Sequence, residues 1–252
     1  MSAKKVKTIL VSQPEPNTQS SPYFDLGKKQ KVKIDFRSFI HVAPVDVAEF
    51  RKQKVNIPSY GAVILTSRNA VDHYFRICDE LRFQVPDTMK YFCMSEAIAY
   101  YLQKYVVYRK RKVFTGKTHF VDLMPLIKRH REEKFLLPSS DILKPVIPEL
   151  LEKDKIDYTR VVLYNTVCSD LTDLADVYYD VLVFFSPSGI KSLFQNFPDF
   201  QQNDTRIAAF GPTTWQAVEE AGLRLDIKAP SKEAPSMTMA LDQYIKKVNV
   251  GK

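Results

Sequence analysis

The sequence is poor in the residues on which most recognisable cofactor and metal sites depend. Its 252 residues include only seven Gly, three Cys and four His. The few scattered glycines form neither a dinucleotide-binding fingerprint nor a phosphate-binding P-loop, and no G-x-S-x-G nucleophile elbow is present. The histidines lie far apart and form no H-E-x-x-H motif or Cys/His cluster, so we expect no metal site. They are His41, His73, His119 and His130.

Long hydrophobic runs are lacking as well. The longest wholly apolar run, Val181 to Phe185, is far shorter than the ~18 residues that a membrane-spanning helix needs. The chain passes from Lys4 and Lys5 directly into a strand-like run, without the apolar stretch of a signal peptide. The three cysteines are odd in number and widely spaced among apolar neighbours, which favours buried, reduced thiols. We therefore expect a cytoplasmic protein with no membrane span.

The positive charge of the chain is concentrated in one segment. Formal net charge is +8, and residues 104–134 hold ten Lys or Arg against three acidic residues. The block Arg109 to Lys112 could contact phosphates, an acidic substrate or only solvent. Zinc-finger spacing, a basic region with heptads and the aromatic sheet motif of RNA-binding domains are all missing, so nucleic-acid binding is not favoured. Basicity alone permits a polyanionic ligand, either a small acidic molecule or a large polymer.

Strand-like runs alternate with helical segments along the chain. Such alternation predicts an α/β fold of parallel sheets with helices on both faces, and several runs are apolar throughout, as in strands buried on both sides. The predicted strands are Lys7 to Ser12, Ile34 to Val42, Ala62 to Leu65, Tyr91 to Met94, Lys134 to Leu137, Val161 to Tyr164, Val181 to Phe185 and Ile207 to Phe210.

The sequence also repeats itself. Residues 62–71 (AVILTSRNAV) reappear 119 positions later as residues 181–190 (VLVFFSPSGI), and residues 92–97 align loosely with 209–214. The matching segments occur in the same order, which indicates a duplicated α/β unit. The length suits two domains, so we predict two related lobes.

Polar turns follow the matching strands. Residues 66–69 (TSRN), 186–189 (SPSG) and 211–214 (GPTT) each end an apolar strand and begin a predicted helix. Such turns offer free N–H groups at the positive end of a helix dipole, at the sheet edge where α/β folds bind ligands, so they suit carboxylates. Taken singly, such a turn is more often a plain N-cap, here Ser67, Ser186 or Thr213, each contributing about 1 kcal/mol, but matching turns in two lobes favour binding.

Together these segments resemble the uroporphyrinogen-III synthase family. The resemblance is carried by residues 65–67 (LTS), 161–166 (VVLYNT), 184–189 (FFSPSG) and 207–214 (IAAFGPTT), and it is strongest from Val181 to Ala229. It implies two lobes, each a parallel sheet flanked by helices and joined by two antiparallel crossing strands. The first lobe would comprise residues 1–37 plus 167–252, the inserted second lobe 43–160, and the hinge strands 38–42 and 161–166.

The resemblance also implies a reaction. Members of the family are lyases that cyclise the linear tetrapyrrole hydroxymethylbilane, with inversion of its last ring, to uroporphyrinogen III in haem biosynthesis. They use no cofactor, and we expect none here. We also expect a monomer that binds the small molecule hydroxymethylbilane between its lobes. Tyr164 matches a family tyrosine proposed to assist departure of the substrate hydroxyl, although a packed strand tyrosine is an equal alternative.

The turns would then bind the acetate and propionate groups of the substrate. Residues 94–97 (MSEA) depart from the family, which has a glycine turn followed by threonine, and Glu96 adds a negative charge. That departure favours the alternative of a non-catalytic tetrapyrrole- or polyanion-binding relative. Arg68 replaces a common proline and could pair with a propionate, and residues 138–141 (PSSD) form a third predicted turn. The substrate-binding residues we predict are Thr66, Ser67, Arg68, Asn69, Ser139, Ser186, Ser188, Gly189, Thr213 and Thr214.

Overall fold

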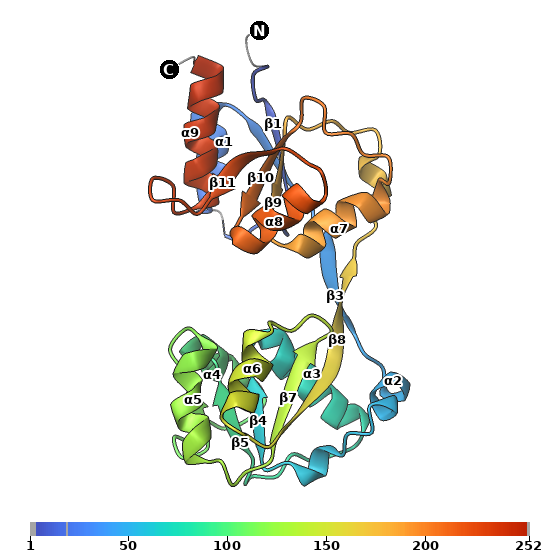
Figure 1. Ribbon diagram of the computed structural model, residues 1–252, viewed down its shortest axis with the longest axis vertical. Coiled ribbons are helices and arrows are strands. Elements are labelled where there is room, and N and C mark those ends of the chain that lie inside the picture. Colours follow the sequence, from blue (N-terminus) through green and yellow to red (C-terminus); the bar gives the residue numbers. More distant parts are fainter. Residues whose placement is uncertain (1–3, 19, 251–252) are drawn as a thin grey trace. The chain divides into compact units, whose positions relative to one another are not determined.

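The computed structural model describes residues 4–18 and 20–250 and divides into two compact units. The first unit comprises Met1–His41 and Val167–Lys252, and the second Val42–Thr166. Each unit contains a sheet with parallel strands flanked by helices, so the predicted α/β class is confirmed (Figure 1). Residues 1–3, which precede the two lysines of the signal-peptide argument, lie outside the described residues.

In the first unit a five-stranded parallel sheet has the order β11-β10-β9-β1-β2. Helices α1 and α9 contact each other, as do α7 and α8, and a separate apolar core packs with each pair. The sheet is therefore covered on both faces. Its elements are β1 (Thr8–Val11), α1 (Pro22–Gln30), β2 (Lys33–Phe36), the 3-10 helix η2 (Thr172–Leu174), β9 (Val181–Phe184), α7 (Pro187–Asn196), β10 (Arg206–Phe210), α8 (Pro212–Glu220), β11 (Leu225–Ala229) and α9 (Met237–Val250).

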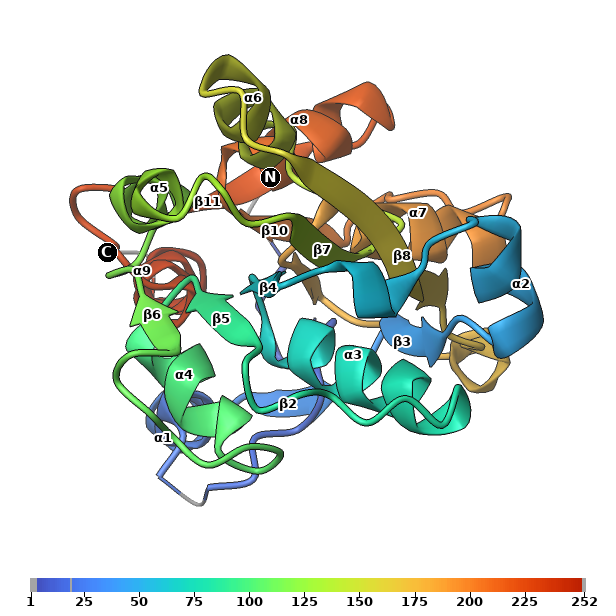
Figure 2. The same cartoon turned by 90° about the horizontal axis from the view of Figure 1, so that it is seen from below.

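The sheet of the second unit has the order β3-β8-β7-β4-β5-β6, and its strands β4 to β8 pair in parallel (Figure 2). Helices α3 and α4 pack with one core, and α5 and α6 with another. Strands β3 and β8 both continue across the boundary into the first unit. The elements are β3 (Ile40–Pro44), α2 (Val47–Lys52), η1 (Ile57–Ser59), β4 (Ala62–Leu65), α3 (Arg68–Glu80), β5 (Lys90–Cys93), α4 (Glu96–Leu102), β6 (Val113–Thr115), α5 (Phe120–Arg129), β7 (Phe135–Ser140), α6 (Val146–Lys153) and β8 (Tyr158–Cys168).

The repeated segment folds the same way in both units. Strands β4 and β9 are buried at every residue, because helices cover both faces of each sheet. The next helix then begins at a serine N-cap, Ser67 in one unit and Ser186 in the other, with φ −155° at both. Each serine accepts a hydrogen bond from the N–H three residues later, which satisfies one of the unpaired donors of the first turn.

Two details of the predicted strands are wrong. The run Ile34 to Val42 is two strands, because the chain leaves the first sheet after Phe36, and the Arg37 guanidinium there bonds the Asp170 carbonyl and the Asp173 carboxylate. Phe39 then turns inward and packs edge-on against Phe184. Strands β6 and β11 escaped prediction, since β6 has only three residues and β11 carries charged side chains.

The cysteines agree only in part with the expectation of buried thiols. Cys78 and Cys93 are buried, and burial raises the pKa of each thiol to about 12. Cys168 is half-buried. All three are free.

Gly211 gives a test of the turn between β10 and α8. Its φ of +89° and ψ of 148° lie in a region that other residues rarely adopt, while a Cβ there would meet no atom within 4 Å. Gly211→Ala should therefore lower the free energy of unfolding by about 1–3 kcal/mol, from backbone strain alone. Urea denaturation measures this free energy. The same substitution at Gly61 would instead report a collision, because a Cβ there would meet the Glu133 carboxylate.

Candidate active site

Two of the predicted turns, those after β4 and β9, lie beside the point in their sheet where the strand order reverses. In the first unit the chain moves from β1 outward to β2, and from β9 outward in the other direction to β10 and β11. In the second unit the reversal lies between β4 and β7. Open α/β sheets bind ligands at the carboxyl ends of the strands beside such a reversal. The turns after β9 and β4 therefore occupy the positions that this rule favours.

The turn after β9 brings α7 close to the end of β1. Ser186 Oγ accepts from the Gly189 N–H at 3.3 Å. A Cβ at Gly189 would lie 3.2 Å from the Phe184 ring and 3.8 Å from Ser12 Oγ, so the small residue permits this approach. The Ser12 N–H donates to the Val183 carbonyl at 3.0 Å. Sequence reasoning missed Ser12, although its signal was present as a hydroxyl residue at the end of an apolar strand.

The turn after β10 differs from the prediction. Gly211, and not Thr213, is the N-cap of α8, because Pro212 takes the first helical position. Thr213 is exposed in the first turn, whereas the Thr214 side chain is 1% exposed. A ligand at this turn can thus reach Thr213, whereas Thr214 is buried and its N–H already donates to the Gly211 carbonyl at 3.0 Å.

The turn after β4 brings together two predicted residues that are 97 positions apart. Ser67 Oγ accepts from the Ala70 N–H at 3.0 Å and lies 3.1 Å from Tyr164 Oη. Thr66 is half-buried, and Arg68 and Asn69 are exposed in the first turn of α3. The Arg68 guanidinium lies 5.3 Å from the centre of the Tyr101 ring, close enough for a cation–π contact.

Burial controls the chemistry of Tyr164. The residue is 7% exposed, and this burial raises the pKa of its phenol, while the hydrogen bond with Ser67 lowers that pKa. The net direction is upward, so the phenol keeps its proton at neutral pH. A protonated phenol at the edge of a ligand-binding turn can donate a hydrogen bond or a proton to an oxygen that is leaving a substrate.

The third predicted turn, residues 138–141, is wrong because β7 continues to Ser140. Strand β4 pairs with β7 only at Phe135 and Leu136, so Pro138, which lacks an N–H, lies beyond that pairing. Ser139 is 1% exposed, and its hydroxyl accepts from Arg160 Nε at 3.0 Å. The Asp141 carboxylate accepts from the Thr166 N–H at 2.8 Å and so joins the end of β7 to β8.

Residues 94–97 form the start of α4. Ser95 is its N-cap, without a side-chain capping bond, and Glu96 is exposed in the first turn. A carboxylate at a helix N-terminus is stabilised by the helix dipole. The structure therefore gives Glu96 a local role in helix stability.

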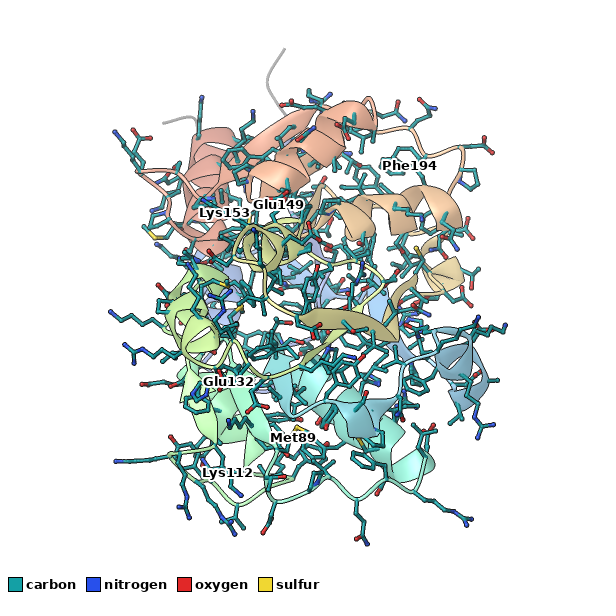
Figure 3. The ribbon with its side chains drawn as sticks, turned by 60° about the horizontal axis from the view of Figure 1, so that its bottom comes forward. Met89, Lys112, Glu132, Glu149, Lys153 and Phe194 are labelled. Carbon is teal, nitrogen blue, oxygen red and sulfur yellow. The ribbon has the colours of Figure 1, made fainter. Side chains whose placement is uncertain are left out.

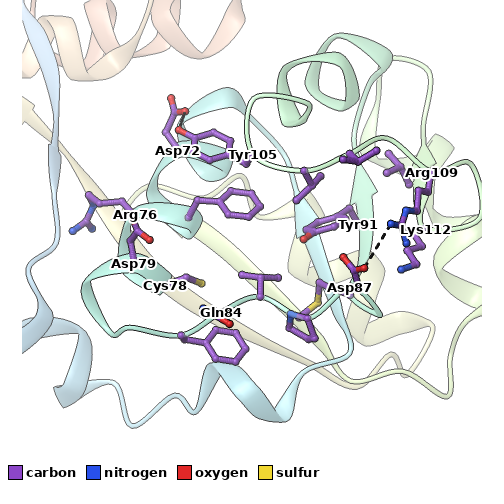
Figure 4. A pocket seen from close by; sticks show the side chains of 18 residues that line it. Asp72, Arg76, Cys78, Asp79, Gln84, Asp87, Tyr91, Tyr105, Arg109 and Lys112 are labelled. Carbon is purple, nitrogen blue, oxygen red and sulfur yellow. Dashed lines mark hydrogen bonds and ion pairs between the residues drawn. The ribbon is translucent and has the colours of Figure 1, made fainter.

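A groove of about 740 Å³ in the second unit lies apart from these turns (Figure 4). Arg109 and Lys112 of the basic block line it, as does Met89, which is also labelled in Figure 3. Asp87 lies 3.6 Å from Arg109, and Asp72 and Asp79 face the same groove, so its positive charges are offset. Neither Tyr164 nor any predicted substrate-binding residue lines it.

Metal-binding clusters and membrane-spanning helices are both absent from the described residues, 4–18 and 20–250. In that part of the chain, no three His, Cys, Asp or Glu side chains lie together as a metal site would need. No helix there is long and apolar enough to cross a membrane.

The family model and the curated relatives that match this chain are all of uroporphyrinogen-III synthases. Residues 25–239 match the family model described as uroporphyrinogen-III synthase HemD. The uroporphyrinogen-III synthase of Chlorobaculum parvum is 24% identical over 260 residues, covering 96% of this chain and 100% of the relative. That of Saccharomyces cerevisiae is 27% identical over 139 residues, which cover 49% of this chain and 50% of the yeast protein.

Solved structures show the same fold. The uroporphyrinogen-III synthetase of Helicobacter pylori aligns with a TM-score of 0.61 at 17% identity, covering 95% of this chain and 99% of that one. A mutant uroporphyrinogen III synthase of Thermus thermophilus aligns with a TM-score of 0.54 at 13% identity, covering 98% and 100%.

Proposed function

Because this chain belongs to the uroporphyrinogen-III synthase family, we propose that it is a lyase of haem biosynthesis that cyclises hydroxymethylbilane to uroporphyrinogen III. The reaction inverts the last ring of the linear tetrapyrrole. The observation that supports this proposal most directly is the contact of Ser67 with Tyr164, since it joins a predicted binding turn to the predicted catalytic side chain.

Tyr164 assists the departure of the substrate hydroxyl. Its phenol is protonated at neutral pH, and its Oη lies beside the turn at the start of α3. The phenol donates its proton to the hydroxyl oxygen as the C–O bond breaks, so that the oxygen leaves as water, and the phenolate then takes up the proton that the pyrrole N–H of the substrate loses as the azafulvene forms. The azafulvene that remains is electrophilic, so the enzyme has mainly to hold the chain in the conformation that closes the ring.

The turns hold the carboxylates of the substrate. Ser186, Ser188 and Gly189 supply the first turn of α7, and Thr213 that of α8. Thr66, Ser67, Arg68 and Asn69 form the corresponding turn in the second unit. Helix N-termini favour anions through their free N–H groups and the helix dipole. We leave Ser139 and Thr214 out of this set. The Ser139 hydroxyl is buried and bonded to Arg160, and the Thr214 N–H is buried and bonded to the Gly211 carbonyl.

We also propose that the protein works as a cytoplasmic monomer without a nucleic-acid partner. The sequence supports this through its reduced-thiol pattern and its lack of nucleic-acid-binding motifs. A binding titration with an oligonucleotide at two ionic strengths tests the last point, since binding through the basic block would weaken steeply with salt.

Analysis of the product isomer tests the reaction. The protein is given freshly prepared hydroxymethylbilane, and the porphyrin isomers are separated after oxidation. We expect the type III isomer, whereas spontaneous ring closure without enzyme gives the symmetrical type I isomer. Type I product alone would exclude the proposed activity, and tight binding of uroporphyrinogen III without turnover would identify a non-catalytic tetrapyrrole-binding protein.

A further inference from the structure

We propose that His73 and Arg76 of helix α3 are positioning residues that fix the ring of Tyr164 for its part in the reaction. The inference rests on the proposed function, in which the Tyr164 phenol assists the departing hydroxyl. Neither residue belongs to a motif that we identified in the sequence, and neither side chain needs to touch the substrate in this role.

The His73 imidazole stacks on the Tyr164 ring. The ring centroids are 4.9 Å apart, and the ring planes differ by 19°. The same helix begins at Ser67, whose hydroxyl meets Tyr164 Oη. Helix α3 thus contacts the tyrosine twice, at the face of its ring and at its hydroxyl. These two contacts restrict the plane of the ring and the position of its oxygen, as a hydrogen-bond donor in catalysis requires.

Arg76 holds the imidazole and ties α3 to the strand that carries Tyr164. Its Nε donates to His73 Nδ1 at 3.2 Å. Its Nη2 donates to the Val45 carbonyl at 2.7 Å and to the carbonyl of Leu163, the residue before Tyr164, at 3.2 Å. The guanidinium therefore links three parts of the unit through bonds of fixed geometry: His73, Val45 just after β3, and Leu163 in β8.

The hydrogen bond from Arg76 also determines which nitrogen of the His73 imidazole carries the proton. Arginine only donates, so Nδ1 must be the acceptor, and the proton of the neutral imidazole is on Nε2. Burial, followed by the charge of Arg76, lowers the pKa of His73, and the weaker effects of Asp72 and Glu80 oppose this shift. The ring against Tyr164 is consequently a neutral aromatic ring at neutral pH, which stacks without placing a cation beside the phenol.

Steady-state kinetics of single variants test the proposal. His73→Leu removes the aromatic face, and we expect kcat for the type III product to fall roughly tenfold while KM stays within about twofold. His73→Phe restores a flat ring and should recover most of the lost kcat. The matched control is Phe75→Leu, which removes a similar stack on the same helix, between Phe75 and Tyr105 at 4.5 Å. It should leave kcat near the wild-type value.

A double variant separates positioning from general destabilisation. In a Tyr164→Phe background, His73→Leu should cause little further loss, because the group that it positions is already gone. Equal loss of kcat in the His73→Leu, His73→Phe and Phe75→Leu variants, or independent losses in the double variant, would overturn the inference. A wild-type protein that yields only type I product would instead overturn the proposed function, so the two failures are distinguishable.

Discussion

Replacing Tyr164 with phenylalanine should lower kcat for formation of the type III isomer about 100-fold, with KM changed less than about threefold. The phenol is the group that we assign to the departing hydroxyl, and general acid assistance of this kind contributes at least about 100-fold to a rate. Since the role assigned to the Tyr164 phenol is at the leaving oxygen and not at the substrate carboxylates, substrate binding should be nearly unaffected by its loss. Initial rates at varied hydroxymethylbilane concentration measure both constants.

Tyr158→Phe is the matched control for this variant. Tyr158 lies on the same strand, and its hydroxyl bonds the Glu152 carboxylate at 3.0 Å instead of a residue of the candidate site. Removing that hydroxyl should leave kcat unchanged. If Tyr164→Phe and Tyr158→Phe had the same small effect, the tyrosine would be a packing residue of β8 and the catalytic assignment would be wrong.

Ser67 and Tyr164 show which parts of this site can be predicted from the sequence. Ser67 was predictable because a hydroxyl residue between an apolar strand and an amphipathic helix marks a helix start at the ligand-binding edge of a parallel sheet. Tyr164 was predictable only through the resemblance to a family. Their contact at 3.1 Å depends on β7 lying between β4 and β8, and that strand order is a tertiary property which short-range patterns do not encode.

His73 and Ser139 mark the limits of the same reasoning. A lone histidine within a helix has no sequence signal for what it stacks on, because the Tyr164 ring comes from a strand 91 residues later. Ser139 had a misleading signal, since proline followed by two serines is typical of a turn. The proline is tolerated in β7 because β4 has already ended its pairing with that strand.

The fold itself was easier to predict, for a physical reason. Strands buried on both faces must be apolar at every position, so β4 and β9 stand out in the sequence. Strand β2, by contrast, is only partly buried, and its continuous run with β3 concealed the break at Arg37. Edge and short strands carry less of the hydrophobic pattern, which is why β6 and β11 were missed.

The second large effect is expected from a negative charge placed at the binding turns. Asn69→Asp in α3 and Ser188→Asp in α7 each put a carboxylate in the first turn of a helix. Each should raise KM about tenfold, because losing a charge-assisted hydrogen bond to a substrate carboxylate costs about 1.5 kcal/mol or more, and tenfold corresponds to about 1.4 kcal/mol. Neither should lower the melting temperature, since aspartate at a helix N-terminus is favourable.

The double variant decides whether the turns of both units contact one substrate molecule. If they do, Asn69→Asp combined with Ser188→Asp should raise KM about 100-fold, because losses at separate sites on one ligand multiply. Asn203→Asp is the matched control, an exposed asparagine in the loop before β10, at the opposite end of the strands from the turns. A control that raises KM equally would mean that net charge alone repels the polyacid, and the local role of the turns would then be disproved. A tenfold increase for only one variant would restrict carboxylate binding to that unit, since a helix N-terminus that meets no carboxylate has no hydrogen bond to lose.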